Sequence, residues 1–121
     1  MNATASRRMR RLLSIRKGLW VETMIRKVAH YRVKKEHVTD VRRIVSEFVG
    51  QVEKHEPRTL YEANIGDDGV TFIHFMSFPS KEDELKHQGA DYTLRFVADL
   101  YPKCKDKPQF TQLSLVRSTV R

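Results

Sequence analysis

One stretch near the middle of the chain, from Val70 to Phe78, constrains the fold more than any other part of the sequence. It lies between the turn-forming residues 66–69 and Pro79, and its aromatic and β-branched residues favour a β-strand. Alternate side chains of a strand point to opposite faces. One face carries Val70, Phe72, His74, Met76 and Phe78, and the other carries Thr71, Ile73, Phe75 and Ser77. Since both faces are largely apolar, we expect helices of the same chain to cover one of them. A second subunit, or a ligand pocket closed by it, would cover the other.

The remaining elements follow from periodicity and turn signals. Residues 25–33 predict a first strand, and an apolar stripe at steps of three and four residues predicts a helix over 36–55. Residues 59–65 predict a strand that forms a hairpin with the central one through Gly66-Asp67-Asp68-Gly69. A capping box at Ser80 and Asp83 predicts a short helix, Asp91 is expected to cap a helix through Tyr101, and 110–117 predicts a last strand. This order is that of an α+β, ferredoxin-like βαββαβ domain with an antiparallel four-stranded sheet.

The composition is that of one ordinary globular domain, with 121 residues, 40% of them hydrophobic, and a net charge of +8. Six basic residues and one acid precede Ile25, so the charge is concentrated at the N-terminus. The remaining chain is only mildly basic and lacks a phosphate-binding loop or an RNA-recognition signature, so we expect no nucleic-acid partner. Cys104 is the single cysteine, which is compatible with a cytoplasmic protein. No apolar run is long enough to cross a membrane, and we expect no membrane partner.

Residues 1–24 are interpreted as a basic N-terminal extension, with the folded domain over 25–118 and a short tail over 119–121. Three hypotheses remain open for this extension. It is a disordered segment preceding a domain that begins at Met24, an arginine-rich organellar presequence, or a basic arm that contacts anionic surfaces.

Several phrases of the sequence resemble the antibiotic biosynthesis monooxygenase family, the dimeric α/β barrels that include quinol monooxygenase-like proteins. They are residues 31–34, residues 55–62 with Glu56-Pro57, the hairpin Asp67-Asp68-Gly69, and His87 followed by residues 91–96. The resemblance covers residues 25–118. It departs from the family at Arg58, where many members have Gly, and at Met76, where many have an acid. No tryptophan occurs in the domain, which argues against the haem-degrading relatives.

The resemblance implies a homodimer formed through the sheet face. It also implies a monooxygenase of the antibiotic biosynthesis type that oxidises a small aromatic, quinol or polyketide-like compound without a cofactor. The alternative is a non-catalytic ligand-binding or structural module of the same fold, since fold alone does not decide function.

His74 is the main candidate for catalysis, because imidazole exchanges a proton near neutral pH and oxygenation of a quinol begins with loss of a proton. It would be the base or an orienting residue. The competing interpretation is a buried histidine bonded to neighbouring side chains. His30 holds the matching place on the first strand, and the two histidines are expected to line one cavity. Two histidines do not make a metal site, so no metal is expected.

The other candidates for substrate binding are residues that offer hydroxyl or guanidinium donors or apolar contacts. They are Tyr31, Tyr61, Phe72, Met76, Tyr92 and Arg95. His87 is expected at a helix end, exposed or capping. Cys104 has no strong activating group beside it and is not expected to be a nucleophile.

Overall fold

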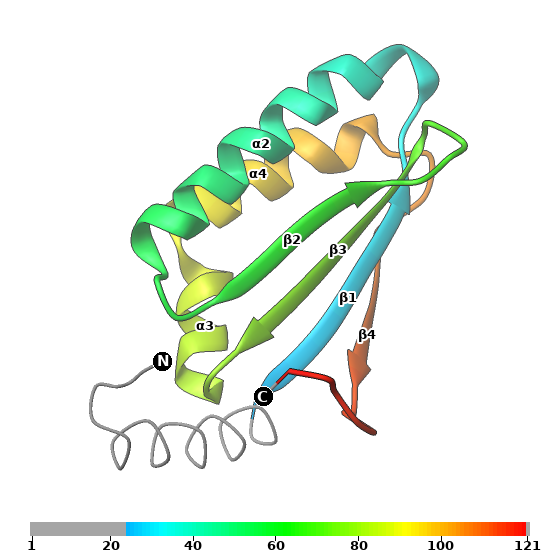
Figure 1. The fold of residues 1–121 in the computed structure, drawn as a ribbon. Coiled ribbons are helices and arrows are strands. Elements are labelled where there is room, and N and C mark those ends of the chain that lie inside the picture. The colour runs from blue at the N-terminus through cyan, green and yellow to red at the C-terminus, as the bar shows by residue number, and fades with distance from the viewer. Residues whose placement is uncertain (1–23, 121) are drawn as a thin grey trace, which may run out of the picture.

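The computed structural model describes residues 24–120, which form a single four-stranded antiparallel sheet with helices on one face (Figure 1). The strands are β1 (Ile25–Arg32), β2 (Leu60–Ile65), β3 (Thr71–Phe78) and β4 (Gln109–Leu113), in the order β2-β3-β1-β4. The helices are α2 (Val38–His55), α3 (Lys81–Gly89) and α4 (Asp91–Leu100), with short 3-10 turns η1 (Lys35–His37) and η2 (Tyr101–Lys103). This is the predicted ferredoxin-like βαββαβ fold, with α3 and α4 in the place of its second helix.

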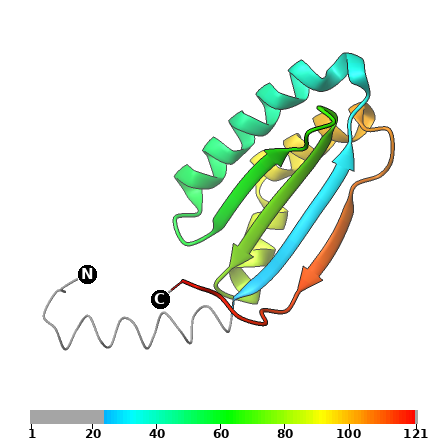
Figure 2. The same ribbon diagram turned by 45° about the vertical axis from the view of Figure 1, so that its right-hand side comes forward.

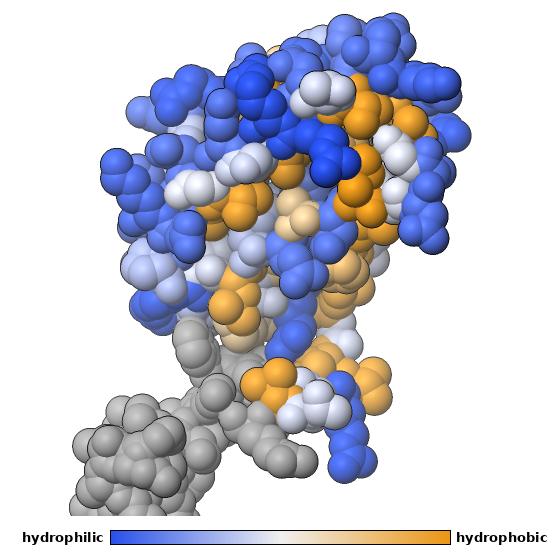
Figure 3. Space-filling model, turned by 45° about the horizontal axis from the view of Figure 1, so that its top comes forward, coloured by the Kyte–Doolittle hydropathy of each residue, from blue (hydrophilic) through white to orange (hydrophobic). Residues whose placement is uncertain are grey.

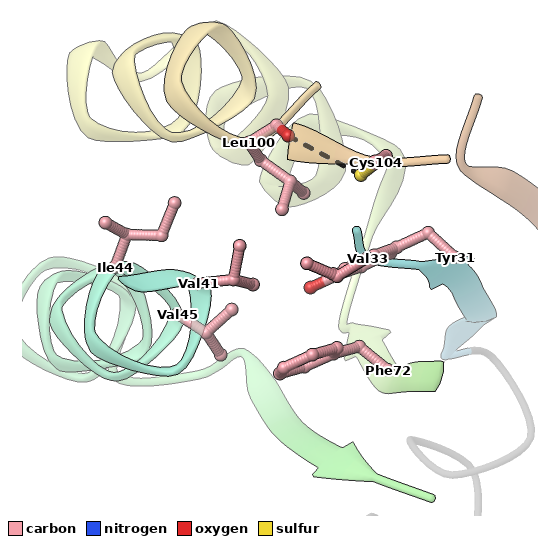
Figure 4. Packing of buried hydrophobic residues seen from close by; sticks show 8 residues of the cluster. All are labelled: Tyr31, Val33, Val41, Ile44, Val45, Phe72, Leu100 and Cys104. Carbon is pink, nitrogen blue, oxygen red and sulfur yellow. Dashed lines mark hydrogen bonds between the residues drawn. The ribbon is translucent and has the colours of Figure 1, made fainter. Parts of the chain in front are cut away.

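The core lies between the sheet and helix α2, whose apolar stripe packs on the central strands. Val41 and Val45 of α2 point towards Val33 and Phe72, and Ile44 points towards the helix that carries Leu100, as Figure 4 shows. The same cluster takes in Tyr31 and, at the end of α4, Leu100 and Cys104. The Cys104 thiol donates to the Leu100 carbonyl oxygen, and burial raises its pKa. A protonated, buried thiol of this kind is a packing residue and not a nucleophile.

Two local signals position the elements around the central strand. Ser80 caps α3, because its hydroxyl accepts from the Asp83 amide at 3.1 Å and donates to the Asp83 carboxylate at 2.7 Å. The hairpin between β2 and β3 turns at Gly69, whose φ of +73° lies in the left-handed region that favours glycine. The Asp68 carboxylate accepts from the amides of Val70 and Thr71 and completes this turn.

Some predicted boundaries differ from the structure. The helix begins at Val38, because residues 35–37 form the 3-10 turn, and the last strand ends at Leu113 instead of Arg117. The prediction that Asp91 caps its helix is wrong. Asp91 is the first helical residue, and the preceding Ala90 offers no side-chain cap. The predicted basic extension over residues 1–24 lies outside the described residues except for Met24.

The two faces of the central strand have different surroundings. Phe72, His74, Met76 and Phe78 are buried beneath the helices, whereas Phe75 on the other face is 47% exposed. Figure 2 shows this second face of the sheet uncovered by any helix of the described chain. Seen from the top of Figure 1, most of the surface is hydrophilic and the exposed hydrophobic residues form separate patches (Figure 3).

Candidate functional site

A cavity of about 270 Å³ lies on the covered face of the sheet, between the strands and helices α3 and α4. Its floor comes from the strands, its roof from the helices, and Phe110 of β4 stands 59% exposed at its edge. Aromatic and aliphatic side chains supply most of the lining. The polar side chains that reach it are Lys27, Tyr31, Tyr61, His74, Glu84, His87, Gln88, Thr93 and Tyr101. An apolar cavity with a few polar groups on its wall is the usual form of a small-molecule site.

His74 lies between two tyrosines on the cavity wall. Its Nε2 is 2.8 Å from the Tyr31 hydroxyl, and its Nδ1 is 2.6 Å from the Tyr61 hydroxyl. Antiparallel pairing brings these groups together, because Ala29 pairs with His74 and Tyr61 pairs with Met76. His74 is 1% exposed, so both of its ring nitrogens are engaged inside the protein.

The protonation states of this Tyr–His–Tyr group follow from its burial. Burial lowers the pKa of His74 to about 4 and raises the pKa of both tyrosine hydroxyls, so all three groups are neutral at pH 7. A neutral imidazole donates one hydrogen bond and accepts one. It therefore accepts from one tyrosine and donates to the other, whose own O–H has no acceptor among the described residues. One hydroxyl hydrogen is left for a ligand.

A second polar group lies beside the first, around the carboxylate of Glu56. His87 Nδ1 is 2.8 Å from Glu56 Oε2, the Tyr92 hydroxyl donates to the same oxygen, and the Thr59 hydroxyl donates to Oε1 at 2.9 Å. Glu56 and His87 are each 6% exposed. The prediction that His87 is exposed or capping is therefore wrong, because the loop after α2 brings a carboxylate to its ring. Tyr61 contacts both groups, with its ring centroid 5.5 Å from His74 and 5.7 Å from His87.

A third polar group closes the end of the cavity near α3. The Glu84 carboxylate is 1% exposed and forms ion pairs with Lys27 of β1 and, at 2.8 Å, with Lys81. Burial raises the pKa of Glu84, but the two ammonium groups outweigh it and hold the pKa below its usual value. Glu84 is therefore ionised, and the two lysines balance its charge. It supplies no free negative charge to the cavity.

The structure brings only part of the predicted substrate-binding set together. Tyr31, Tyr61, Met76 and His74 line the cavity, and Phe72 lies behind it, stacked on the Tyr31 ring at 5.5 Å.

Three predicted substrate-binding residues do not line the cavity. His30 pairs with Ile73 in the sheet, so it points to the uncovered face and not into a cavity shared with His74. Tyr92 lies behind Glu56, and the exposed Arg95 lines a separate groove of about 380 Å³ between α2 and α4. Strand register places His30 outside this cavity, and the rotation of α4 places Tyr92 and Arg95 outside it.

His87, Glu56 and Glu84 are the site residues that the sequence prediction missed. His87 and Glu56 both lie in the phrases that resemble the antibiotic biosynthesis monooxygenase family. Their presence in those phrases was the signal in the sequence, because only the fold brings the two together from 31 positions apart.

Two further features bear on the class of site. Across residues 24–120, no helix is long and apolar enough to cross a membrane. The same residues contain no group of three or more histidine, cysteine, aspartate or glutamate side chains arranged to hold a metal ion.

The structure defines an antiparallel ferredoxin-like protein with a mostly apolar cavity between sheet and helices. No protein-family model matches the sequence, and no curated protein sequence matches it. Solved structures do match. An antibiotic biosynthesis monooxygenase is 17% identical, with a TM-score of 0.71 over 77% of this chain and 99% of its own. The protein Rv0793 from Mycobacterium tuberculosis is 14% identical, with a TM-score of 0.72 over 79% of this chain and 98% of its own.

A conserved protein from Methanosarcina mazei Go1 is also 14% identical, with a TM-score of 0.74 over 80% of this chain and 97% of its own. The chain therefore has the fold of the antibiotic biosynthesis monooxygenase proteins. The resemblance seen in the sequence is confirmed at the level of the fold.

Proposed function

We propose that the protein is a monooxygenase of the antibiotic biosynthesis type, acting on a small phenol or quinol held in the cavity between sheet and helices. The observation that carries this proposal is an aromatic-lined cavity with one unfilled tyrosine hydroxyl on its wall. Its volume of about 270 Å³ lies just below the range of about 300–1,000 Å³ usual for drug-sized ligands, which favours a compound of one or two rings.

The proposed reaction balances without an added cofactor. Two hydrogens are lost, either both from a methylene carbon next to the phenol ring or one from a ring C–H and one from the phenol O–H, and that carbon gains one oxygen atom as a carbonyl. The second atom of dioxygen leaves as water with those two hydrogens. The ligand supplies all four electrons that reduce dioxygen to the carbonyl oxygen and water, so the protein needs only to bind the phenol, remove its proton and exclude bulk water.

In this proposal His74 is the orienting residue. With both ring nitrogens bonded to tyrosines, it has no free nitrogen for the ligand's proton. It instead fixes the two hydroxyls, one of which donates to the ligand oxygen and stabilises the negative charge that develops there. Tyr31, Tyr61 and Met76, which line the cavity, would form the binding wall.

Oxygen uptake tests the proposal. We expect consumption with at least one member of a panel of naphthoquinols, anthrones and substituted hydroquinones, and its loss in Val97→Phe, which fills the cavity. Ala98→Phe is the matched control, because Ala98 is exposed on the same helix and does not line the cavity. No consumption with any compound, or equal rates in both variants, would count against the proposal.

The second candidate is a non-catalytic binding module of the same fold. The full hydrogen-bonding of His74 favours it, since a saturated histidine is what a structural role requires. Tight binding of a panel compound without oxygen uptake, lost in Val97→Phe and kept in Ala98→Phe, would identify this function.

We further propose that a second copy of the chain covers the uncovered face of the sheet. Leu60, Phe75 and Leu113 are 60%, 47% and 39% exposed there, on three of the four strands. Exposed apolar side chains gathered on one face indicate a protein interface. We expect a dimer by sedimentation, and a monomer for Phe75→Glu. Leu94→Glu, exposed on α4 away from this face, is the control and leaves the dimer intact. A monomeric wild type refutes the proposal.

A further inference from the structure

The hydrogen bonds around Glu56 fix which nitrogen of His87 carries a proton. Tyr92 and Thr59 both donate to the Glu56 carboxylate, and His87 Nδ1 lies 2.8 Å from Oε2 and 3.0 Å from Oε1. Burial and the bond to Glu56 raise the pKa of the Tyr92 hydroxyl, which therefore keeps its proton. A carboxylate that already accepts from Tyr92 and Thr59 offers only acceptor oxygens to His87 when it is ionised. His87 therefore donates through Nδ1–H, and in the neutral ring Nε2 holds the lone pair.

The lone pair on Nε2 is left unused by the protein. Among residues 24–120, Nε2 has no hydrogen-bond partner. It is not among the fully buried polar atoms that lack a partner, so it remains accessible. The ring lines the cavity, packed between Phe78 at 5.0 Å and Phe48 at 5.7 Å between ring centroids. This is the reverse of His74, whose two nitrogens are both taken. His87 is an oriented imidazole with a carboxylate on one side and a free acceptor on the other.

We propose that His87 accepts the proton of an acidic hydroxyl on the cavity ligand, a phenol or an enol, and that Glu56 is its positioning residue. This inference rests on the proposed function, because it assigns the proton acceptor of the same cavity. In the step, the O–H bond of the ligand breaks, an N–H bond forms at Nε2, and the electron pair stays on the ligand oxygen. The imidazolium then lies beside the Glu56 carboxylate, which stabilises it as a buried acid stabilises a catalytic histidine.

The charged groups around the cavity are compatible with this step. Glu56 contacts His87 from the loop after α2, Tyr92 from α4 holds Glu56, and Tyr61 from β2 packs on the ring. Glu84 on α3 is neutralised by Lys27 and Lys81. Glu56 is therefore the one unbalanced carboxylate that contacts His87 among the described residues, and its charge lies beside the ring that receives the proton.

The test uses para-nitrophenol, whose anion is yellow, in the absence of oxygen. We expect the bound phenol to ionise at a lower pH on the wild-type protein than on His87→Gln, with an ionisation constant larger by about tenfold or more. Glu56→Gln is expected to lie between the two, since it keeps the imidazole and removes the positioning charge. His37→Gln, half-buried on η1 and not among the residues that line the cavity, is the control and is expected to titrate as wild type.

Equal ionisation of the bound phenol on wild type and His87→Gln would overturn the inference. Absence of any binding to the wild type would overturn the class of ligand. If His87→Gln does not fold, ring-nitrogen NMR of the wild type decides. Protonation of Nε2 on addition of para-nitrophenol supports the inference, and an unchanged His87 signal refutes it.

These measurements need no turnover. Failure of oxygen uptake with every quinol removes the proposed oxygenation and leaves phenol deprotonation standing. An inert His87 removes this assignment and leaves oxygenation standing.

Discussion

The low pKa of His74 makes the stability of the fold depend on pH in a predictable direction. Burial lowers this pKa from the ordinary 6.5 to about 4. Above pH 6.5 the ring is neutral in both the folded and unfolded chain. Between 6.5 and 4 the unfolded chain binds a proton that the folded chain refuses, so stability falls as the pH falls. Since one pKa unit corresponds to about 1.4 kcal/mol, the loss amounts to about 3 kcal/mol at pH 4.

The perturbation that isolates this effect is His74→Gln. Glutamine offers one donor and one acceptor group to Tyr31 and Tyr61 but does not titrate. We expect urea unfolding at pH 7, 6, 5 and 4 to give a wild-type free energy of unfolding that falls more steeply than that of the variant. From pH 7 to pH 4, the difference between the free energies of unfolding of the wild type and the variant should narrow by about 3 kcal/mol. Carboxylates titrate in both proteins and cancel in the difference. Parallel curves would refute the assignment of a neutral, buried His74.

Three further predictions concern stability and are checked by thermal or urea unfolding. Gly69→Ala should destabilise the fold by about 1 kcal/mol, because Gly69 has a φ of +73°. Gly50→Ala should stabilise it by about 0.5–1 kcal/mol, because a Cβ at this position inside α2 meets open space. Equal effects of the two substitutions would contradict the argument. Ser80→Ala should cost about 1 kcal/mol through loss of the cap on α3, and Ser80→Asp should recover most of it, so a neutral Ser80→Ala would exclude the cap as a contributor. Val33→Ala, at a fully buried core position, should cost about 2 kcal/mol, while a cost near zero would show a core that collapses around the change.

The sequence was sufficient for the fold because its strongest signals were local. The stripe of α2, the Ser80 capping box and the turn at Gly69 each specify an element without reference to the rest of the chain. The alternation of β3 also predicted that Phe72, His74, Met76 and Phe78 share a face, and all four are buried together. Order and type of elements then leave few topologies open.

The site was harder to predict because it depends on the pairing between strands. His30 and His74 occupy matching places in their own strands, but the observed register sets His30 opposite Ile73. A change of one position in register moves every side chain of a strand to the other face. Strand β1 mixes basic and apolar residues on both faces, so its sequence did not fix that position.

The site residues on helix α3 could not be predicted for a different reason. Its sequence has a single large apolar residue, Leu85, which is 55% exposed, while Glu84 is 1% exposed. The hydrophobic pattern therefore predicts the wrong buried side. Glu84 and His87 are buried because Lys27 and Glu56 come from distant parts of the chain to pair with them. No local pattern contains such a pairing.

The two buried histidines show why burial alone does not identify a reactive group. Both lie on the cavity wall, and Tyr61 contacts both of them. Both ring nitrogens of His74 are hydrogen-bonded to tyrosines, so His74 cannot bond directly to a ligand. In His87 only Nδ1 is hydrogen-bonded, to the Glu56 carboxylate, whose negative charge stabilises positive charge on the ring. Its Nε2 has no partner among the described residues and is not fully enclosed, so a donor on a bound ligand can pair with it. A phenol offers that donor, and its oxygen then offers an acceptor to the tyrosine hydroxyl that has none.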